Sequence, residues 1–359
     1  MLFEKYNITK RECNTMKYAL LLILLAGCAQ TLNFAQWDEG LPKAGEWRTN
    51  LAVGDVNNDG LLDIAGIGRK GTANASVWLN QGNGNWQLSA EGIQQKMECG
   101  VGVDFGDVNN DGNLDIAYGR HCGGPTIYLG DGTGKWTYHS TGLLPDNVNP
   151  IALADFDNDG LLDVVTLGAA LEGFTIYQNT GDKWKLINTN LPEKTESSTY
   201  HIITDDINVD GKQDIISGIG IYLNTDKFTF KQNFAFTASY VAYKDSFLAI
   251  SGPRQLLVYK QKNGWELYRN LTMYCENGGG IVLEDINNDE KIDLVASCIT
   301  GIRTFLGPNF DEASNNIPIA EARPQGLKVA DVNNDGKTDI IAAFGQEGSI
   351  GGIQVWTPK

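Results

Sequence analysis

The stretch Asp55-Val56-Asn57-Asn58-Asp59-Gly60-Leu61-Leu62-Asp63 decides the fold of this chain. It places side-chain oxygens at positions 1, 3, 5 and 9 of a nine-residue loop, with glycine at position 6 and apolar runs on both sides. Carboxylate and amide oxygens around a tight turn suit a hard cation with roughly six to eight oxygen ligands, which is calcium. Glycine at position 6 permits a positive φ, so that the loop can close around the ion.

The same loop recurs five times along the chain. Its further copies are DVNNDGNLD from Asp107, DFDNDGLLD from Asp155, DINVDGKQD from Asp206, DINNDEKID from Asp285 and DVNNDGKTD from Asp331. Ordinary polar turns would not need an aspartate at position 9 every time, so six copies indicate six metal loops. The closing aspartate at position 9 and the strand-like flanks distinguish this loop from the EF-hand, which closes with Glu at position 12 between helices.

The predicted calcium ligands are side-chain oxygens at positions 1, 3, 5 and 9 and the backbone carbonyl oxygen at position 7. In the six loops these positions are held by Asp55, Asn57, Asp59, Leu61 and Asp63; Asp107, Asn109, Asp111, Asn113 and Asp115; Asp155, Asp157, Asp159, Leu161 and Asp163; Asp206, Asn208, Asp210, Lys212 and Asp214; Asp285, Asn287, Asp289, Lys291 and Asp293; and Asp331, Asn333, Asp335, Lys337 and Asp339.

The chain is strongly acidic, with a formal net charge of −16, which argues against a nucleic-acid partner. The six loops alone hold 19 aspartates. The acidity therefore reflects a set of metal ligands more than a surface made for basic partners.

The N-terminal segment reads as a targeting signal. Residues 18–26 form an apolar run that is too short for a spanning helix, which needs about 20 residues, and a short basic region from Met16 precedes it. The run ends in Leu25-Ala26-Gly27-Cys28, which resembles a bacterial lipobox and implies a signal peptide over 1–27, acylation of Cys28 and a tether over 28–32. A plain secretory signal with an incidental cysteine is the alternative, and Met16 is a second candidate start. Ala29 after the cysteine, in place of Asp, favours the outer membrane in a diderm bacterium.

Four cysteines follow the leader: Cys99, Cys122, Cys275 and Cys298. They allow three pairings, and two equal separations of 23 residues favour Cys99 with Cys122 and Cys275 with Cys298. Each pair brackets one acidic loop. The second pair needs a register shift, for which Gly278-Gly279-Gly280 is the expected place. Disulfides agree with an exported protein.

The loop spacing predicts a ring of repeats. First aspartates follow one another at intervals of 52, 48, 51, 79 and 46 residues, so the long interval holds a repeat without a loop. Residues 239–268 supply it, with the acidic loop reduced to a turn near Lys244-Asp245. Each of the seven repeats reads as four strands, and periods of this length are typical of propellers and solenoids. Aromatic residues on the third and fourth strands are expected to pack between sheets.

The chain ends explain how the ring closes. The last repeat stops after its third strand, and residues 33–42 resemble the missing fourth strand. The N-terminal strand should therefore complete the last sheet and remove the exposed edges. The expected fold is all-β, a seven-bladed β-propeller of four-stranded antiparallel blades over residues 33–359.

On the pattern D-x-[DN]-x-D-G-x-x-D, the chain resembles the FG-GAP/VCBS-type repeat proteins, whose best-known relative is the integrin alpha-subunit propeller. The resemblance implies calcium in the turn between the first two strands of a blade. It does not imply one activity, because propellers carry many. Glu290 departs from the pattern by occupying the glycine position, so we expect the loop from Asp285 to Asp293 to bind calcium most weakly.

No catalytic constellation is visible among the three histidines. Connections on the face opposite the metal loops offer Arg69, Arg120, His121, Lys194 and Arg254 as candidate ligand residues. The sequence favours a non-catalytic, lipid-anchored adhesion or binding module of the cell envelope, monomeric and directed at a cell-surface glycan or protein. The alternatives are a lyase-like enzyme acting on polysaccharide, which would need Arg69, Arg120 and His121 to converge, and an envelope assembly scaffold.

Overall fold

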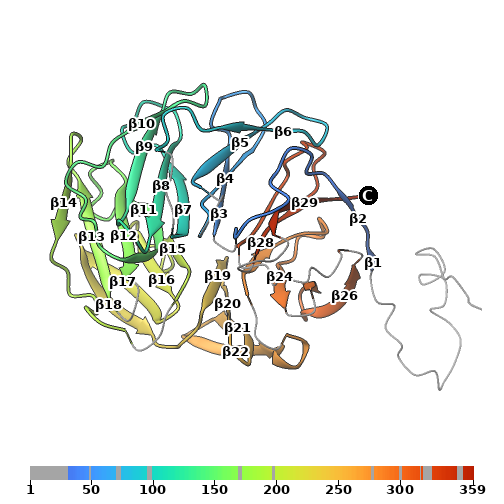
Figure 1. The fold of residues 1–359 in the computed structure, drawn as a ribbon. Coiled ribbons are helices and arrows are strands. Elements are labelled where there is room, and N and C mark those ends of the chain that lie inside the picture. Colours follow the sequence, from blue (N-terminus) through green and yellow to red (C-terminus); the bar gives the residue numbers. More distant parts are fainter. Residues whose placement is uncertain are drawn as a thin grey trace, which may run out of the picture.

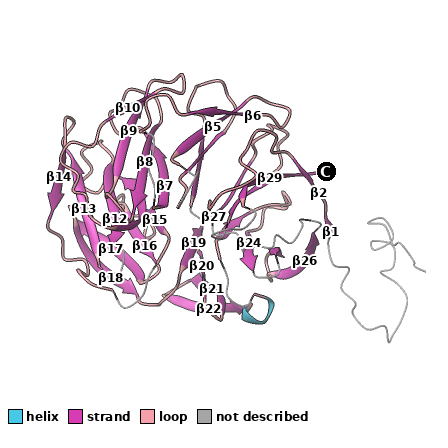
Figure 2. Cartoon of the chain, in the orientation of Figure 1, coloured by secondary structure: helices cyan, strands magenta, loops and turns pink. Residues whose placement is uncertain are grey.

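The computed structural model describes residues 31–47, 50–69, 74–94, 99–168, 172–195, 199–275, 279–298, 301–315, 317, 326–345 and 351–359. They form seven antiparallel sheets arranged around a central axis (Figure 1). Figure 2 shows that the described elements are strands apart from one short 3₁₀ helix, η1 (Thr272–Tyr274). The predicted seven-bladed β-propeller is confirmed.

Blades 1 to 4 each consist of four consecutive strands. Blade 1 contains β3 (Leu51–Gly54), β4 (Asp63–Gly66), β5 (Ser76–Asn80) and β6 (Trp86–Ser89). Blade 2 contains β7 (Gly100–Gly106), β8 (Asp115–Arg120), β9 (Thr126–Gly130) and β10 (Trp136–Tyr138). Blade 3 contains β11 (Val148–Ala154), β12 (Asp163–Gly168), β13 (Phe174–Asn179) and β14 (Trp184–Ile187). Blade 4 contains β15 (Ile202–Asp205), β16 (Asp214–Ser217), β17 (Gly220–Asp226) and β18 (Thr229–Phe234).

The remaining blades include the ends of the described chain. Blade 5 contains β19 (Tyr240–Lys244), β20 (Phe247–Gly252), β21 (Gln255–Gln261) and β22 (Trp265–Asn270). Blade 6 contains β23 (Ile281–Glu284), β24 (Asp293–Cys298), β25 (Gly301–Leu306) and β26 (Asp311–Asn315), with β1 (Thr31–Leu32) added at its edge. Blade 7 contains β27 (Gly326–Ala330), β28 (Asp339–Phe344), β29 (Gly352–Pro358) and β2 (Phe34–Gln36).

The hydrophobic cores lie between neighbouring blades. One cluster joins Ala65 and Val77 of blade 1 to Ile116 and Tyr128 of blade 2. The second strands are buried on both faces, as in the fully buried β24, because they are covered by blades on either side. Most aromatic residues of the third and fourth strands are buried as predicted, for example Trp86 and Trp184. They pack between neighbouring sheets.

The N-terminal strand closes the ring as predicted. β2 pairs antiparallel with β29, with Phe34 opposite Pro358, and the two strands lie together near the C-terminus (Figure 1). One further strand was not expected: β1 pairs in parallel with β26, with Thr31 opposite Ser314, where the sequence suggested only a tether. The segment that enters the propeller therefore contacts blade 6 before it completes blade 7.

Blade 5 lacks the acidic loop, as its sequence predicted. Lys244 of β19 lies opposite Phe247 of β20, so that only two residues form the turn. The predicted signal peptide and Cys28 lie outside the described residues. Within the described part of the chain, no helix has the length and apolar character needed to cross a bilayer.

Two disulfides join the predicted partners. Cys99 pairs with Cys122 at a Cα–Cα distance of 5.6 Å, and Cys275 pairs with Cys298 at 5.1 Å. The predicted register shift lies in the other blade. The β7–β8 ladder is irregular between Gly100 and Gly102, whereas the β23–β24 ladder is regular.

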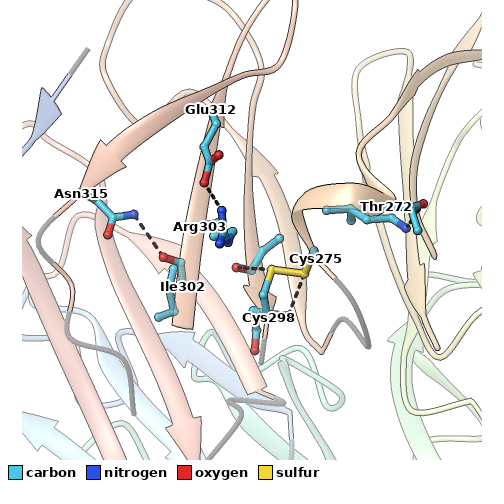
Figure 3. Close-up of a disulfide and its surroundings, with 10 residues drawn as sticks. Thr272, Cys275, Cys298, Ile302, Arg303, Glu312 and Asn315 are labelled. Atoms are coloured by element: carbon cyan, nitrogen blue, oxygen red, sulfur yellow. Dashed lines mark hydrogen bonds and ion pairs between the residues drawn. A yellow bond between two sulfur atoms is a disulfide. The ribbon is translucent and has the colours of Figure 1, made fainter. Parts of the chain in front are cut away.

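The second disulfide is reached through a short helix. In blade 6, η1 leads the chain directly to Cys275, and Arg303 forms an ion pair with Glu312 close by (Figure 3). Gly279 donates its N–H to the carbonyl oxygen of Ser297 at 2.7 Å, so the approach to β23 is held against β24 without a bulge. Gly278 lies outside the described residues.

Candidate functional site

Six acidic loops connect the first to the second strand of their blades. In blade 1, the two carboxylate oxygens of Asp55 accept N–H bonds from Asp59 at 3.1 Å and from Gly60 at 2.8 Å. Asp59 in turn accepts the N–H of Leu61 at 2.8 Å. These bonds fold the side chains at positions 1, 3 and 5 toward one another, since the side-chain oxygen of Asn57 also faces the N–H of Asp59 at 3.3 Å. Each carboxylate oxygen keeps a lone pair for a further partner.

The third loop shows that the donor set fits a divalent cation. Each of Asp155, Asp157 and Asp159 offers one carboxylate oxygen, and these oxygens lie within 4.8 Å of one another. Asp157 Oδ1 is buried and has no hydrogen-bond partner among the described residues, although Gln178 donates to Oδ2 at 2.8 Å. A cation would stabilise three converging carboxylates with a buried unpartnered oxygen, and all-oxygen donors are those that calcium prefers.

The aspartate at position 9 has a second role in the fold. Asp63 is fully buried, and its two oxygens accept N–H bonds from Val56 at 3.0 Å and from Asn80 at 2.8 Å. The carboxylate therefore ties the start of the loop to the third strand of the blade. The corresponding aspartates that accept two such bonds are Asp115, Asp163, Asp214 and Asp293.

Burial strongly affects the ionisation of these position-9 carboxyls. Desolvation raises the pKa of Asp63 to about 7, backbone hydrogen bonds oppose the shift, and the neighbouring Asp59 and Asp55 add to it. Desolvation raises the pKa of Asp163 and Asp339 to about 7 as well. A bound cation would offset both the desolvation and the repulsion between carboxylates.

In blade 7 the position-9 aspartate accepts only one of the two backbone hydrogen bonds, because a proline occupies the place of the second donor. Asp339 accepts the N–H of Val332 at 2.9 Å, but its Oδ1 is buried without a partner among the described residues. The residue that corresponds to Asn80 on the third strand is Pro358, which has no N–H to donate. The seventh-blade loop therefore keeps a carboxylate oxygen that a cation could satisfy.

The sequence analysis missed the asparagines of the third strands. Asn80 Nδ2 donates at 2.7 Å to the carbonyl oxygen of Val332, at position 2 of the preceding loop. Asn179 makes the same contact with Val108 at 2.7 Å, and Asn224 makes it with Phe156 at 2.9 Å. The sequence pattern that could have revealed these contacts is an asparagine two residues after the third-strand aromatic residue, which occurs in three repeats.

The asparagines at position 4 were missed as well. They form a ladder around the face that carries the acidic loops, because each donates from Nδ2 to the loop of the next blade. The donors and acceptors are Asn58 to Asn113 Oδ1, Asn110 to Gly160 O, Asn158 to Gly211 O, Asn288 to Gly336 O and Asn334 to Gly60 O. Blade 4 has Val209 at this position, and the next blade has no loop to accept a bond. Asparagine thus occurs in the five loops that are followed by another loop.

Backbone conformation explains which residues occur at positions 4 and 6 of the loop. Position 6 has a positive φ, as predicted, with values of 86° at Gly60 and 78° at Gly336. Glu290 adopts the same region with φ 64°, which is unfavourable for a residue with a Cβ. Position 4 also has a positive φ, which asparagine tolerates, whereas the β-branched Val209 at φ 58° does not adopt it readily.

The opposite face brings together two of the five candidate ligand residues. Arg69 follows β4 and His121 follows β8, so both lie at the ends of strands that lead away from the acidic loops. Burial lowers the pKa of His121, and the positive charge of Arg69 lowers it further. His121 Nε2 is buried without a partner among the described residues.

The other three candidates do not join this pair. Arg120 is held in its own hairpin, where it donates to Gly123 O at 3.2 Å and to Thr126 Oγ1 at 3.1 Å. Lys194 and Arg254 are exposed on blades 3 and 5, and among the described residues neither makes a contact with Arg69 or His121. The convergence of Arg69, Arg120 and His121 that a lyase-like site requires is therefore incomplete.

Curated relatives cover part of the chain. Cartilage acidic protein 1 of Mus musculus is 28% identical over 211 residues, which are 53% of this chain and 32% of that protein. The protein of the same name from Xenopus tropicalis is 28% identical over 42% of this chain and 23% of its own length. The chain thus spans about a third or less of the curated relatives it matches.

Two solved structures are similar in fold. One is the extracellular domain of a one component system of B. thetaiotaomicron, with a TM-score of 0.53 and 15% identity over 90% of this chain and 39% of that chain. The other is an Agrocybe aegerita lectin that recognises non-reducing terminal N-acetylglucosamine, with a TM-score of 0.42 and 15% identity over 89% of this chain and 80% of that chain.

A family model of the FG-GAP-like repeat matches residues 55–118, 107–166, 155–217 and 285–342, which together exceed half of the chain. Each matched segment begins at the first aspartate of an acidic loop and extends into the next repeat or blade. The chain belongs to the FG-GAP-like repeat family.

Proposed function

We propose that this protein is a calcium-stabilised, lipid-anchored binding or adhesion module of the cell envelope, with no catalytic role of its own. The observation that carries the proposal is the ring of six acidic loops on one face of a closed propeller. That face is occupied by loop-to-loop and loop-to-strand bonds, so the opposite face is left to present variable connections to a glycan or a protein. Loops placed by a rigid scaffold are the usual location of binding residues.

In this proposal calcium has a structural role. The side chains at positions 1, 3, 5 and 9 and the carbonyl at position 7 would hold the ion, and the ion would neutralise the converging carboxylates. At about 1 mM calcium and a dissociation constant near 0.1 mM, each site adds about 1.4 kcal/mol to the free energy of unfolding. Six sites together approach about 8 kcal/mol, which is comparable with the stability of a whole domain.

Thermal unfolding with and without chelator tests the calcium role. We expect excess chelator to lower the melting temperature by many degrees and added calcium to restore it, with magnesium as the control ion. Magnesium should restore little, because it demands a smaller octahedral shell. A melting curve that chelator leaves unchanged would refute structural calcium.

A glycan array tests the binding role. Residues 31–359, loaded with calcium, should be retained on a defined glycan class, and retention should be lost in chelator because the propeller loosens. Arg69→Ala should weaken retention, whereas Lys231→Ala on the outer strand β18 should not. If the well-folded protein binds no glycan and captures no envelope protein, the binding proposal fails.

One observation favours a second candidate, a lyase-like enzyme on polysaccharide. The N–H of Cys99 donates to the carbonyl oxygen of Arg69 and the N–H of His121 donates to that of Cys99, so Arg69 and His121 flank the same residue. Burial, and after it the charge of Arg69, lower the pKa of His121, which favours a neutral general base near a charge-neutralising cation. Incubation of each bound glycan with the protein, followed by analysis of chain length, decides between the two. Chain cleavage that is lost in His121→Gln would support the enzyme.

A further inference from the structure

A cavity of about 280 Å³ lies on the propeller axis, and a smaller hollow that includes Arg69 adjoins it at Asn50, His201, Ile281 and Leu327. All seven blades contribute to its wall. Most of the wall is apolar, with residues such as Ile151 of β11, Ile203 of β15 and Leu283 of β23. Four ionisable side chains also line it: Asp104 of β7, His201 just before β15, Tyr243 of β19 and Lys328 of β27.

Lys328 is the unusual member of this wall. Its side chain is half-buried, and its ammonium group makes no hydrogen bond or ion pair with any described residue. Burial lowers the pKa of Lys328, and the negative charge of Asp104 raises it again. The half-buried ammonium group therefore faces the cavity without a counter-ion in contact, and an anionic group that enters the cavity can pair with it.

Asp104 does not supply that group directly, because it is engaged elsewhere. Its Oδ2 accepts the N–H of Leu153 in the neighbouring blade at 2.9 Å, and its Oδ1 accepts the N–H of Phe105 at 3.0 Å. No ion pair within 4.0 Å joins Asp104 to Lys328 among the described residues. The two charges attract each other across the cavity without contact.

His201 adds a hydrogen-bond acceptor. Its Nδ1 lies 2.7 Å from the carbonyl oxygen of Val241, which can only accept, so Nδ1 carries the proton. Burial and the charge of Lys328 lower the pKa of His201 to about 4, so the ring is neutral at pH 7. Its Nε2 therefore offers a lone pair on a ring that lines the cavity.

We propose that this axial cavity binds a small organic carboxylate that also carries a hydroxyl or an ammonium group, such as a short hydroxy acid or amino acid. The carboxylate pairs with Lys328, the hydroxyl or ammonium donates to His201 Nε2 or Asp104, and the compact carbon body contacts the apolar wall. The proposed ligand groups here are Lys328 and His201 and not Arg69, so Lys328→Met and Arg69→Ala distinguish this proposal from the proposed glycan or protein site.

Isothermal titration of the calcium-loaded protein in chloride-free buffer tests this proposal. The probes are L-lactate and L-alanine, with propionate as the carboxylate that lacks a second polar group and chloride as a simple anion. We expect saturable binding of lactate or alanine, with propionate and chloride about tenfold weaker or more. Equal affinity for chloride, or no saturable heat with either L-lactate or L-alanine, would overturn the proposal.

Three variants link the binding to the cavity. Lys328→Met keeps the length and packing of the side chain but removes its charge, and should weaken binding by about tenfold or more. Lys328→Arg keeps the charge and should retain binding. Lys231→Met on the outer strand is the matched control and should bind as the unaltered protein does. Undiminished binding by a folded Lys328→Met protein would also overturn the proposal.

Discussion

Asn334 of blade 7 donates a hydrogen bond from its Nδ2 to the carbonyl oxygen of Gly60 in blade 1, at 3.0 Å. The bond joins the last acidic loop to the first across the closure of the ring. The same contact recurs between successive loops and is interrupted at Val209, where the next blade has no loop. The six proposed calcium sites are therefore connected as one run from blade 6 through blades 7, 1, 2 and 3 to blade 4.

Removal of one ladder bond should weaken the ring and its calcium binding. Asn334→Gly deletes the donor without strain, because glycine accepts the φ of 56° found there. We expect the free energy of unfolding to fall by about 0.5–1 kcal/mol in saturating calcium, since the bond is exposed. Calcium affinity should fall in the calorimetric titration, because the loop of blade 1 loses its restraint.

Asn83→Gly is the matched control for this change. Asn83 has a similar φ of 53°, is exposed in the β5–β6 hairpin, and makes no side-chain hydrogen bond with the described residues. Denaturant unfolding should show a smaller loss for this variant than for Asn334→Gly. Equal losses would show that the ladder bond contributes nothing.

Val209→Asn should stabilise the protein. Val209 is 87% exposed and sits at φ 58°, a conformation that is unfavourable for a β-branched side chain and acceptable for asparagine. We expect a gain of about 1 kcal/mol in the free energy of unfolding. Val209→Ala, which removes only the branching, should recover part of it. A loss of stability in Val209→Asn, measured by thermal and denaturant unfolding, would contradict this account of the strain.

Glu290→Gly should increase the calcium affinity of the proposed site in blade 6. The substitution removes the strain of a side chain at φ 64°, which is about 1–2 kcal/mol, or about a tenfold change in affinity. Glu290→Gln separates strain from charge, because it keeps the Cβ and removes the carboxylate. We expect a calcium titration to show the gain for Glu290→Gly alone. A similar gain in both variants would assign the effect to charge.

The stability of the protein should decrease as the pH falls from 7 to 5, in part through His201. The pKa of His201 is about 4 in the folded protein, whereas an exposed histidine has a pKa of 6.5. Between pH 7 and pH 5 the unfolded chain therefore binds a proton at His201, and the folded protein remains largely unprotonated there. The stability that a neutral His201 supplies is present above pH 6.5 and is lost as the pH falls toward 4. The expected loss between pH 7 and pH 5 is about 2 kcal/mol.

His201→Gln isolates this contribution, because glutamine can still donate to Val241 and does not titrate. Lys328 and Asp104 face the same cavity, and burial raises the pKa of Asp104, which opposes the pH effect of the histidine. The test therefore compares how the free energy of unfolding changes with pH in the unaltered protein and in His201→Gln, both measured by denaturant unfolding in saturating calcium. If the free energy of unfolding depended on pH in the same way in both proteins, His201 would not be buried in its neutral form.

Local patterns in the sequence were sufficient to predict the fold. A nine-residue loop with glycine at position 6 fixes a turn by itself, and its recurrence marks the blades even where Lys244 and Asp245 replace the loop. The missing last strand required a partner, and only the N-terminal segment carried the matching pattern. The two cysteines of each disulfide lie 23 residues apart on either side of one acidic loop, so their spacing in the sequence was sufficient to predict the pairing.

The interactions between blades were decided by the tertiary structure. Asn334 and Gly60, or Asn80 and Val332, are distant in sequence and meet only because the ring closes, so no local pattern could pair them. Lys328, Asp104 and His201 likewise belong to three blades and face one cavity because each lies on or beside an innermost strand. The sequence by itself determined the loops, the blades and the closure, since these depend on short-range backbone and side-chain preferences. The closed ring decided which side chains meet across blades, because strand twist and blade packing place them there.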